Sequence, residues 1–161
     1  MRIKILIVDE DPSYKTALLA RFPEPEFSVT SVRTYGYALQ LVGKTGFDIA
    51  ILEYSMGSLT ADYLCEEIRR RNEDTAIILT SGENSPALEK KIRGFAPMFY
   101  FSKPYQSEDM YVVVCKFIKN RFQKQLHRNP ENSLPEKGSE NADVNGKISS
   151  VMLGGLAAGI A

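Results

Sequence analysis

The sequence predicts an α/β fold in which helices cover both faces of a parallel sheet. Short apolar runs alternate with segments of helical periodicity, five of each. One of these runs, at residues 47–53, ends on Glu53 and is apolar through its middle, as expected of a strand buried on both faces. Strands joined by helices pair in parallel through right-handed crossovers. We therefore expect a three-layer, doubly wound α/β sandwich around a five-stranded sheet.

The expected strands are rich in aliphatic and β-branched residues and lie at residues 3–8, 27–32, 47–53, 75–80 and 98–101. The expected helices carry apolar stripes and lie at residues 12–22, 35–44, 61–68, 85–93 and from 107 onward. Asp11, Ser85 and Ser107 are residue types that cap helix N-termini. Pro12 follows the first of them, where a missing N–H costs nothing. The alternating run at 27–32 indicates an edge strand.

Composition divides the 161 residues into three parts. Residues 1–125 are long enough for one domain with a sizeable core. Residues 126–147 are almost wholly polar, which predicts a disordered tail. Residues 148–161 are apolar and rich in Gly and Ala, but shorter than the roughly 20 residues of a membrane span, so a membrane anchor is not expected. Neither tail is suited to be an output domain, so we expect either a stand-alone module that acts through contacts or a fragment of a longer chain.

Charge and cysteine content limit the partners and the compartment. The 20 basic residues balance the 20 acidic ones, so no global field draws the chain to nucleic acid or membrane. Cys65 and Cys115 lie in expected helices without metal-ligand spacing, which indicates reduced thiols. The N-terminus carries no signal-peptide pattern. We expect a cytoplasmic protein.

Polar residues end or follow four of the expected strands. They are Asp9, Glu10, Glu53, Thr80 and Lys103. The carboxyl ends of parallel strands share one edge of the sheet, so these side chains should converge. Three close carboxylates need a compensating cation, which Lys103 supplies in part and Mg²⁺ would complete. With Thr80, they would form a cradle for a phosphoryl group.

Four segments make a family resemblance specific: residues 5–12 (ILIVDEDP), 47–53 (FDIAILE), 77–81 (IILTS) and 101–105 (FSKPY). Residues 1–125 resemble the receiver domain of two-component response regulators. The resemblance implies the flavodoxin-like strand order 2-1-3-4-5. It also implies a phosphoryl group passed from a histidine kinase to an aspartate that ends the third strand, with Mg²⁺ bound by the neighbouring acids.

By position, the resemblance assigns a role to each residue of this site. The metal ligands would be Asp9, Glu10, Glu53 and the backbone carbonyl of Ser55; Glu53 would occupy the phosphoacceptor position; Thr80 and Lys103 would contact the phosphoryl group; and Tyr100 would be the aromatic switch residue.

Glu53 departs from the family pattern, which has aspartate at this position. The extra methylene extends the carboxylate by roughly 1.3–1.5 Å. Such a displacement of a nucleophile costs on the order of 10²-fold in rate. The substitution favours a pseudo-receiver that is not an enzyme, acts through protein contacts without phosphorylation, and binds Mg²⁺ weakly or not at all. The alternative is a Mg²⁺-dependent phosphoacceptor; a phosphohydrolase would need an aspartate nucleophile and a second acid that residues 53–55 lack.

The last expected helix carries apolar residues on two sides. Its second apolar row consists of Tyr111, Cys115, Ile118 and Phe122. A helix with two apolar sides is either packed between other elements or contacts a partner. We expect this row to contact a histidine kinase, another signalling regulator or a second copy of the chain.

Overall fold

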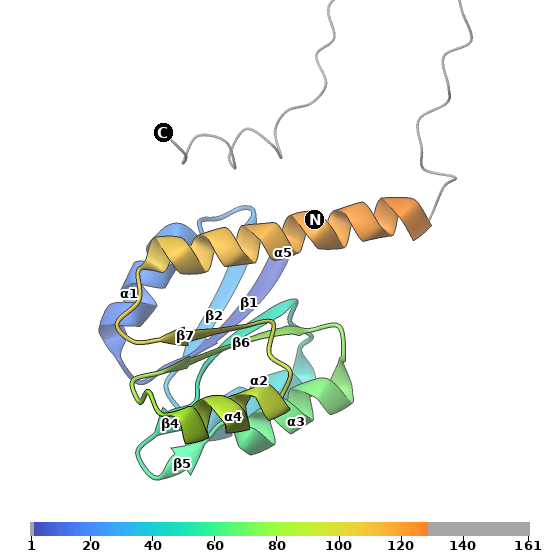
Figure 1. The fold of residues 1–161 in the computed structure, drawn as a ribbon. Coiled ribbons are helices and arrows are strands. Elements are labelled where there is room, and N and C mark those ends of the chain that lie inside the picture. Colours follow the sequence, from blue (N-terminus) through green and yellow to red (C-terminus); the bar gives the residue numbers. More distant parts are fainter. Residues whose placement is uncertain (1, 129–161) are drawn as a thin grey trace, which may run out of the picture. The chain divides into compact units, whose positions relative to one another are not determined.

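The computed structural model describes residues 2–128, and the chain divides into two units after Val113. The first unit contains a five-stranded sheet in the order β2-β1-β3-β6-β7, in which every neighbouring pair is parallel (Figure 1). Its strands are β1 (Ile3–Val8), β2 (Phe27–Val32), β3 (Ile49–Glu53), β6 (Ala76–Ser81) and β7 (Phe99–Ser102). The predicted fold class and strand order are confirmed.

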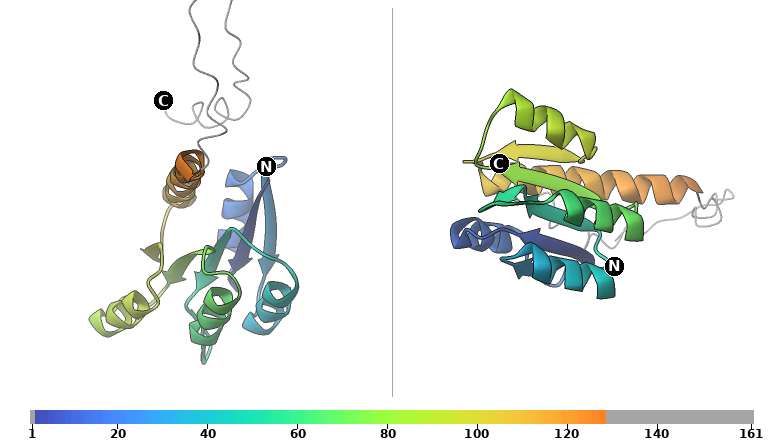
Figure 2. Two further views of the ribbon diagram at one scale, coloured as in Figure 1. Left: turned by 90° about the vertical axis from the view of Figure 1, so that its right-hand side faces the viewer. Right: turned by 90° about the horizontal axis from the view of Figure 1, so that it is seen from below.

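Helices cover both faces of this sheet. They are α1 (Pro12–Arg21), α2 (Tyr35–Lys44), α3 (Asp62–Arg71), α4 (Pro86–Gly94) and α5 (Ser107–Arg128), the last of which continues past the division at Val113. In Figure 2, α2, α3 and α4 lie side by side on one face, and α1 lies on the other. The carboxyl edge of the sheet is therefore open only at the loops that leave the strands.

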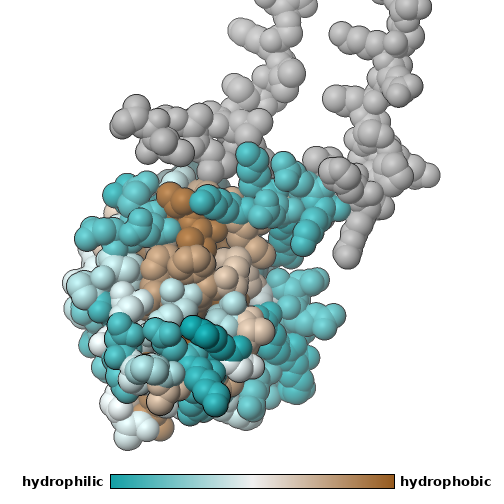
Figure 3. Space-filling view, viewed as in Figure 1, coloured by the Kyte–Doolittle hydropathy of each residue, from teal (hydrophilic) through white to brown (hydrophobic). Residues whose placement is uncertain are grey.

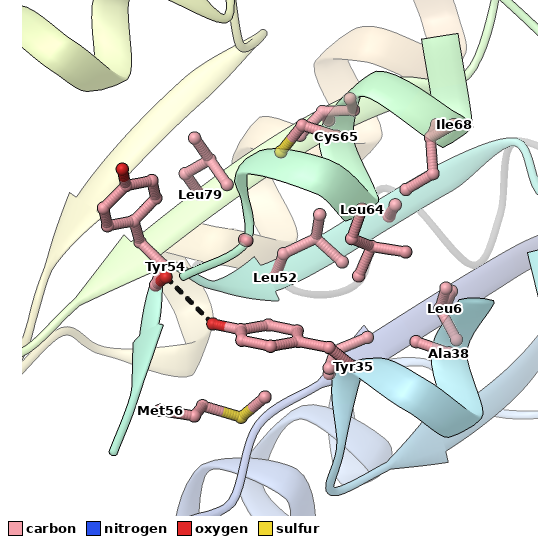
Figure 4. Close-up of a cluster of buried hydrophobic side chains, with 14 of the residues drawn as sticks. Leu6, Tyr35, Ala38, Leu52, Tyr54, Met56, Leu64, Cys65, Ile68 and Leu79 are labelled. Carbon is pink, nitrogen blue, oxygen red and sulfur yellow. Dashed lines mark hydrogen bonds between the residues drawn. The ribbon is translucent and has the colours of Figure 1, made fainter. Parts of the chain in front are cut away.

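The central strands are buried because both faces of the sheet are covered. All residues of β3 and β6 are buried, whereas β2 is only partly buried, as expected of an edge strand. On one face, Leu6, Leu52 and Leu79 of the sheet pack in one cluster with Ala38 of α2 and Leu64 of α3 (Figure 4). This rigid core holds the ends of the strands in register.

Short polar side chains fix the helix starts. The Asp11 carboxylate accepts a hydrogen bond from Ser13 N at 2.8 Å. The Ser85 hydroxyl accepts one from Leu88 N at 3.2 Å, so the caps expected at Asp11 and Ser85 are confirmed, whereas Ser107 is the first residue of α5. Asp11 lies two residues after Asp9, so this cap also orients the loop that carries the first site residue.

The structure differs from the prediction at one loop and, by one to three residues, at several ends of helices and strands. Residues after β3 form a short antiparallel hairpin, β4 (Ser55–Met56) with β5 (Leu59–Thr60), which the sequence did not predict. Gly57 turns it with φ +61°, a conformation that favours glycine. The fourth and fifth strands of the sheet end at Ser81 and Ser102, one residue later than expected.

The domain boundary near residue 125 falls inside α5, which runs to Arg128, and remains a prediction. The tail expected at residues 148–161 and most of residues 126–147 lie outside the described residues. Within the described part, no helix combines the length and the apolar character that crossing a membrane requires.

Candidate functional site

Three charged side chains from distant segments meet at the carboxyl edge of the sheet. Asp9 follows β1, Glu53 ends β3, and Lys103 follows β7. The Lys103 ammonium lies 2.8 Å from Asp9 Oδ2 and 3.0 Å from Glu53 Oε1. The cluster is nearly closed to water, since only 11% of the Lys103 side chain is exposed. The predicted convergence is therefore found for these three residues.

The oxygens of the two carboxylates differ in their partners. Asp9 uses both of its oxygens, because Oδ1 accepts a hydrogen bond from Asp11 N at 2.8 Å. Glu53 Oε2 is buried and has no hydrogen-bond partner, and the same is true of Thr80 Oγ1. Glu53 and Thr80 are paired in the register of β3 and β6. Thr80 thus lies at the site, as predicted, without a bond to Glu53.

One ammonium opposes two carboxylates, and this imbalance shifts the pKa values. Burial raises the pKa of Glu53 to about 7, and the neighbouring Asp9 acts in the same direction against the opposing effect of Lys103. Burial by itself would lower the pKa of Lys103, but its bonds to Asp9 and Glu53 outweigh burial and raise it. Lys103 therefore stays charged, while Glu53 changes protonation near neutral pH.

The sequence did not assign Tyr14, which lies against the ammonium, or Tyr105, which packs on Tyr14, to the site. Lys103 Nζ lies 4.3 Å from the ring centroid of Tyr14 on α1. The Tyr14 ring packs on the Tyr105 ring at 4.8 Å. Burial raises the pKa of Tyr105, and Asp9 adds to this. In the sequence, Tyr14 is one member of the apolar stripe of a helix, so its pattern pointed to the core.

The roles of the other two expected metal ligands, Glu10 and the Ser55 carbonyl, remain predictions. Glu10 is exposed to solvent. Ser55 is half-buried and begins the hairpin strand β4, where it pairs with Thr60. Within residues 2–128, no group of three or more Asp, Glu, His or Cys side chains is arranged to hold a metal ion. The acids that do meet, Asp9 and Glu53, meet across Lys103.

Tyr100, the predicted switch residue, lies on β7 away from the charged cluster. Its hydroxyl donates a hydrogen bond to the Glu83 carbonyl at 3.2 Å. Its ring helps to line a hollow of about 360 Å³ between α4 and β7, together with Ile92, Pro97 and Phe99. The switch position is therefore part of a surface hollow.

A tyrosine network that sequence reasoning missed fixes the end of β3. The Tyr35 hydroxyl donates to the carbonyl oxygen of Glu53 at 2.7 Å and to that of Tyr54 at 2.9 Å; Figure 4 shows the second bond. The Tyr54 hydroxyl donates to Asp62 Oδ1 at 2.6 Å, and Lys91 Nζ lies 2.9 Å from Asp62 Oδ2. These bonds connect the residue next to Glu53 with α2, α3 and α4.

The residues of the predicted partner row on α5 are all partly buried. Tyr111 packs on Phe22 of α1 with their ring centroids 5.8 Å apart. This residue therefore also contributes to packing within the first unit.

A family profile described as "response regulator receiver domain" matches residues 5–114. This range includes Asp9, Glu53, Thr80 and Lys103. The chain belongs to this receiver family. Receiver domains are modules of two-component signalling, so the chain is a receiver domain of a two-component signalling protein. Among curated proteins, none matches its sequence.

Solved receiver structures share the fold. The signal receiver domain of a putative LuxO repressor from Vibrio parahaemolyticus has 16% identity and a TM-score of 0.69, with 78% of this chain and 97% of that chain covered. The chemotaxis response regulator CheY4 of Vibrio cholerae has 19% identity and a TM-score of 0.64, with 73% and 99% covered. A Burkholderia pseudomallei response regulator with a phosphorylated aspartic acid and a calcium ion has 18% identity and a TM-score of 0.63, with 82% and 76% covered. At these identities, the likeness concerns the fold.

Proposed function

We propose that this receiver domain is a pseudo-receiver, which signals through protein contacts and does not depend on phosphorylation. The observation that carries the proposal is Glu53, which ends β3 where the family pattern has aspartate. The receiver from Burkholderia pseudomallei is described with a phosphorylated aspartic acid. A side chain that is one methylene longer places its carboxylate differently in the same fold.

The contacts of Glu53 support this proposal. Its Oε1 is bonded to Lys103 at 3.0 Å, and its Oε2 is buried. A nucleophile must reach the phosphorus atom with an exposed and aligned oxygen. Because only 9% of Glu53 is exposed, neither oxygen is well placed to attack a phosphoryl donor from solvent.

The bond between Glu53 and Lys103 also resembles part of a phosphorylated site. It gives Lys103 a negative partner without any phosphoryl group, although with about one charge in place of nearly two. Thr80 lacks the corresponding bond, since its hydroxyl has no partner. We infer that the substitution supplies the lysine contact permanently and leaves the threonine contact unmade.

Exposed apolar surface supports signalling by protein contact. Phe99 on β7 is 45% exposed and borders the hollow between α4 and β7. Figure 3 shows apolar surface in the upper half of the described part of the chain, with hydrophilic residues around it. We propose that this hollow and the apolar row on α5 bind a histidine kinase or another regulator of the pathway, or a second copy of the chain.

Phosphorylation tests the proposal directly. The chain is incubated with acetyl phosphate and Mg²⁺, and the intact mass is measured under conditions that preserve acyl phosphates. We expect no phosphoryl adduct on the natural chain and at least about 10²-fold faster labelling of Glu53→Asp, because aspartate shortens the nucleophile by one methylene. A labile adduct on Glu53 at the rate of the Asp variant would contradict the proposal.

Docking needs a separate test with a purified histidine kinase or regulator as bait. Phe99→Glu and Ile118→Glu place a charge on the two apolar surfaces and should each weaken binding. Tyr37→Glu is the matched control, because Tyr37 is also exposed but lies on α2. Equal binding by all three variants would remove these surfaces from the proposal.

A further inference from the structure

We propose that Lys103 is the built-in counter-ion of the Asp9–Glu53 pair and that Tyr14 holds it there, so that the pocket balances its carboxylates without a divalent cation. The inference concerns the same pocket as the proposed function and rests on it. It makes a separate claim, about metal binding, which a phosphorylation assay does not measure.

The first argument is the position of the ammonium. Lys103 Nζ lies 2.8 Å from Asp9 Oδ2 and 3.0 Å from Glu53 Oε1, so a single cation bridges both acids. A divalent ion shared by these two acids would also have to lie between their carboxylates. With Lys103 in that position, an added cation would meet a positive charge at close range in a pocket that screens charge poorly.

The second argument is the supply of ligand oxygens. Three of the four carboxylate oxygens are already in use: Asp9 Oδ1 binds Asp11 N, while Asp9 Oδ2 and Glu53 Oε1 bind Lys103. The fourth, Glu53 Oε2, is buried without a hydrogen-bond partner, as is the hydroxyl of Thr80 at the paired position of β6. Mg²⁺ requires a near-octahedral shell of oxygens, and Glu10 stands out in solvent. The residues present therefore do not fit the ion.

The third argument is the aromatic wall behind the ammonium. The Tyr14 ring lies 4.3 Å from Lys103 Nζ, and a cation held over a ring is stabilised most where water is excluded. Tyr14 itself is held by Tyr105 at 4.8 Å, and Tyr105 packs on Phe101 at 5.3 Å. The ring therefore has little freedom to move aside.

The far end of α1 is held as well. Arg21 Nη1 lies 2.6 Å from Glu108 Oε2 at the start of α5. Together with the aromatic packing near the N-terminus of α1, this exposed ion pair orients the helix. Tyr14 is thus a positioning residue, which acts on the pocket through Lys103.

Magnesium titration of the full chain tests the inference without any phosphoryl donor. MgCl₂ is added while amide shifts are followed by NMR and the heat of binding is measured by calorimetry. We expect no saturable binding to the natural chain at millimolar Mg²⁺. Lys103→Met should gain binding at the pocket by at least about tenfold in affinity, because it removes the competing charge and frees two oxygens.

Three matched variants separate this effect from a general change of charge or packing. Lys91→Met removes an exposed lysine that also pairs with a carboxylate beside a tyrosine, and it should gain no Mg²⁺ binding. Tyr14→Leu should gain part of the effect of Lys103→Met, whereas Tyr14→Phe, which keeps a ring, should behave like the natural chain. These two variants also decide the question if Lys103→Met does not fold.

Saturable Mg²⁺ binding by the natural chain with the affinity of Lys103→Met would overturn the counter-ion role. Equal behaviour of Tyr14→Leu and Tyr14→Phe would overturn the role of Tyr14. The natural chain could bind Mg²⁺ and still not be phosphorylated. That result would contradict this inference and leave the proposed function standing, so the two failures are distinguishable.

Discussion

Two lysines of this receiver domain have the same kinds of neighbours in opposite surroundings. Lys103 pairs with Asp9 and Glu53 beside the Tyr14 ring, and 11% of its side chain is exposed. Lys91 pairs with Asp62 at 2.9 Å, and its side chain is 54% exposed. Lys91 Nζ also lies over a tyrosine ring, at 5.7 Å from the Tyr54 centroid. The two clusters are chemically alike, but only the first is closed to water.

This difference shows that burial decides what such a cluster does. An exposed ion pair is screened by water and salt, so it mainly orients its residues. A buried pair has lost its hydration, so removing one partner leaves an uncompensated charge in the interior. Each charge of the Lys103 cluster therefore needs its partners to remain in the interior. The Lys91 cluster is an exposed connection between α3 and α4.

The largest expected effect is on the free energy of unfolding when each of the two lysines is replaced. Lys103→Met should lower the free energy of unfolding by about 3 kcal/mol, because Asp9 and Glu53 then remain buried without a counter-charge. Lys91→Met should change it only slightly. Urea denaturation of both variants at pH 7 measures this, and equal losses would show that burial does not separate the two clusters.

A smaller effect concerns the pH dependence of the buried cluster. The pKa of Glu53 rises from an ordinary 4.5 to about 7 in the folded state. The folded chain then binds more protons than the unfolded chain between these values, so stability falls as the pH rises through this window. We expect a decrease of about 2–3 kcal/mol between pH 5 and pH 8, which Glu53→Gln should lack because it does not titrate. Thermal melting of both chains at pH 5 and pH 8 provides the check; parallel curves would show that Glu53 does not titrate in this range.

The smallest expected effect concerns Tyr35, which is bonded to the backbone of Glu53 in one cluster and of Tyr54 in the other. Tyr35→Phe removes the hydroxyl that donates to the carbonyls of Glu53 and Tyr54, and should cost about 1 kcal/mol of stability. Because the end of β3 then loses a constraint, the amide protons of residues 53 and 54 should exchange faster. Unchanged exchange rates would mean that β3 is held by the sheet alone.

Much of this fold could be predicted because the information is local in the sequence. The apolar runs specify buried strands, and the residues that end them fall at one edge once the strands are parallel. Asp9, Glu53, Thr80 and Lys103 were found in this way. The hairpin after β3 was missed because its two strands have only two residues each, too few to show a period.

The missed contacts are those between residues far apart in the chain. The sequence places Tyr14 in an apolar stripe and Tyr35 at the start of a helix, and only the packing of α1 and α2 brings their aromatic or polar groups to the site. Glu10 follows Asp9 directly, yet it is exposed while its neighbour is buried. Adjacent residues in a loop can differ in this way because the direction of each side chain depends on the elements around it.

The sequence by itself determined the parallel α/β fold, the edge at which the charged residues gather and the glutamate that ends the third strand of the sheet. Only the tertiary structure decided that Lys103 bridges two acids and that Tyr14 stands behind it. The physical reason is the separation along the chain of the residues involved. Periodicity and strand ends are properties of neighbouring residues. The charge balance of a buried pocket depends on which distant side chains share it and on the water they exclude.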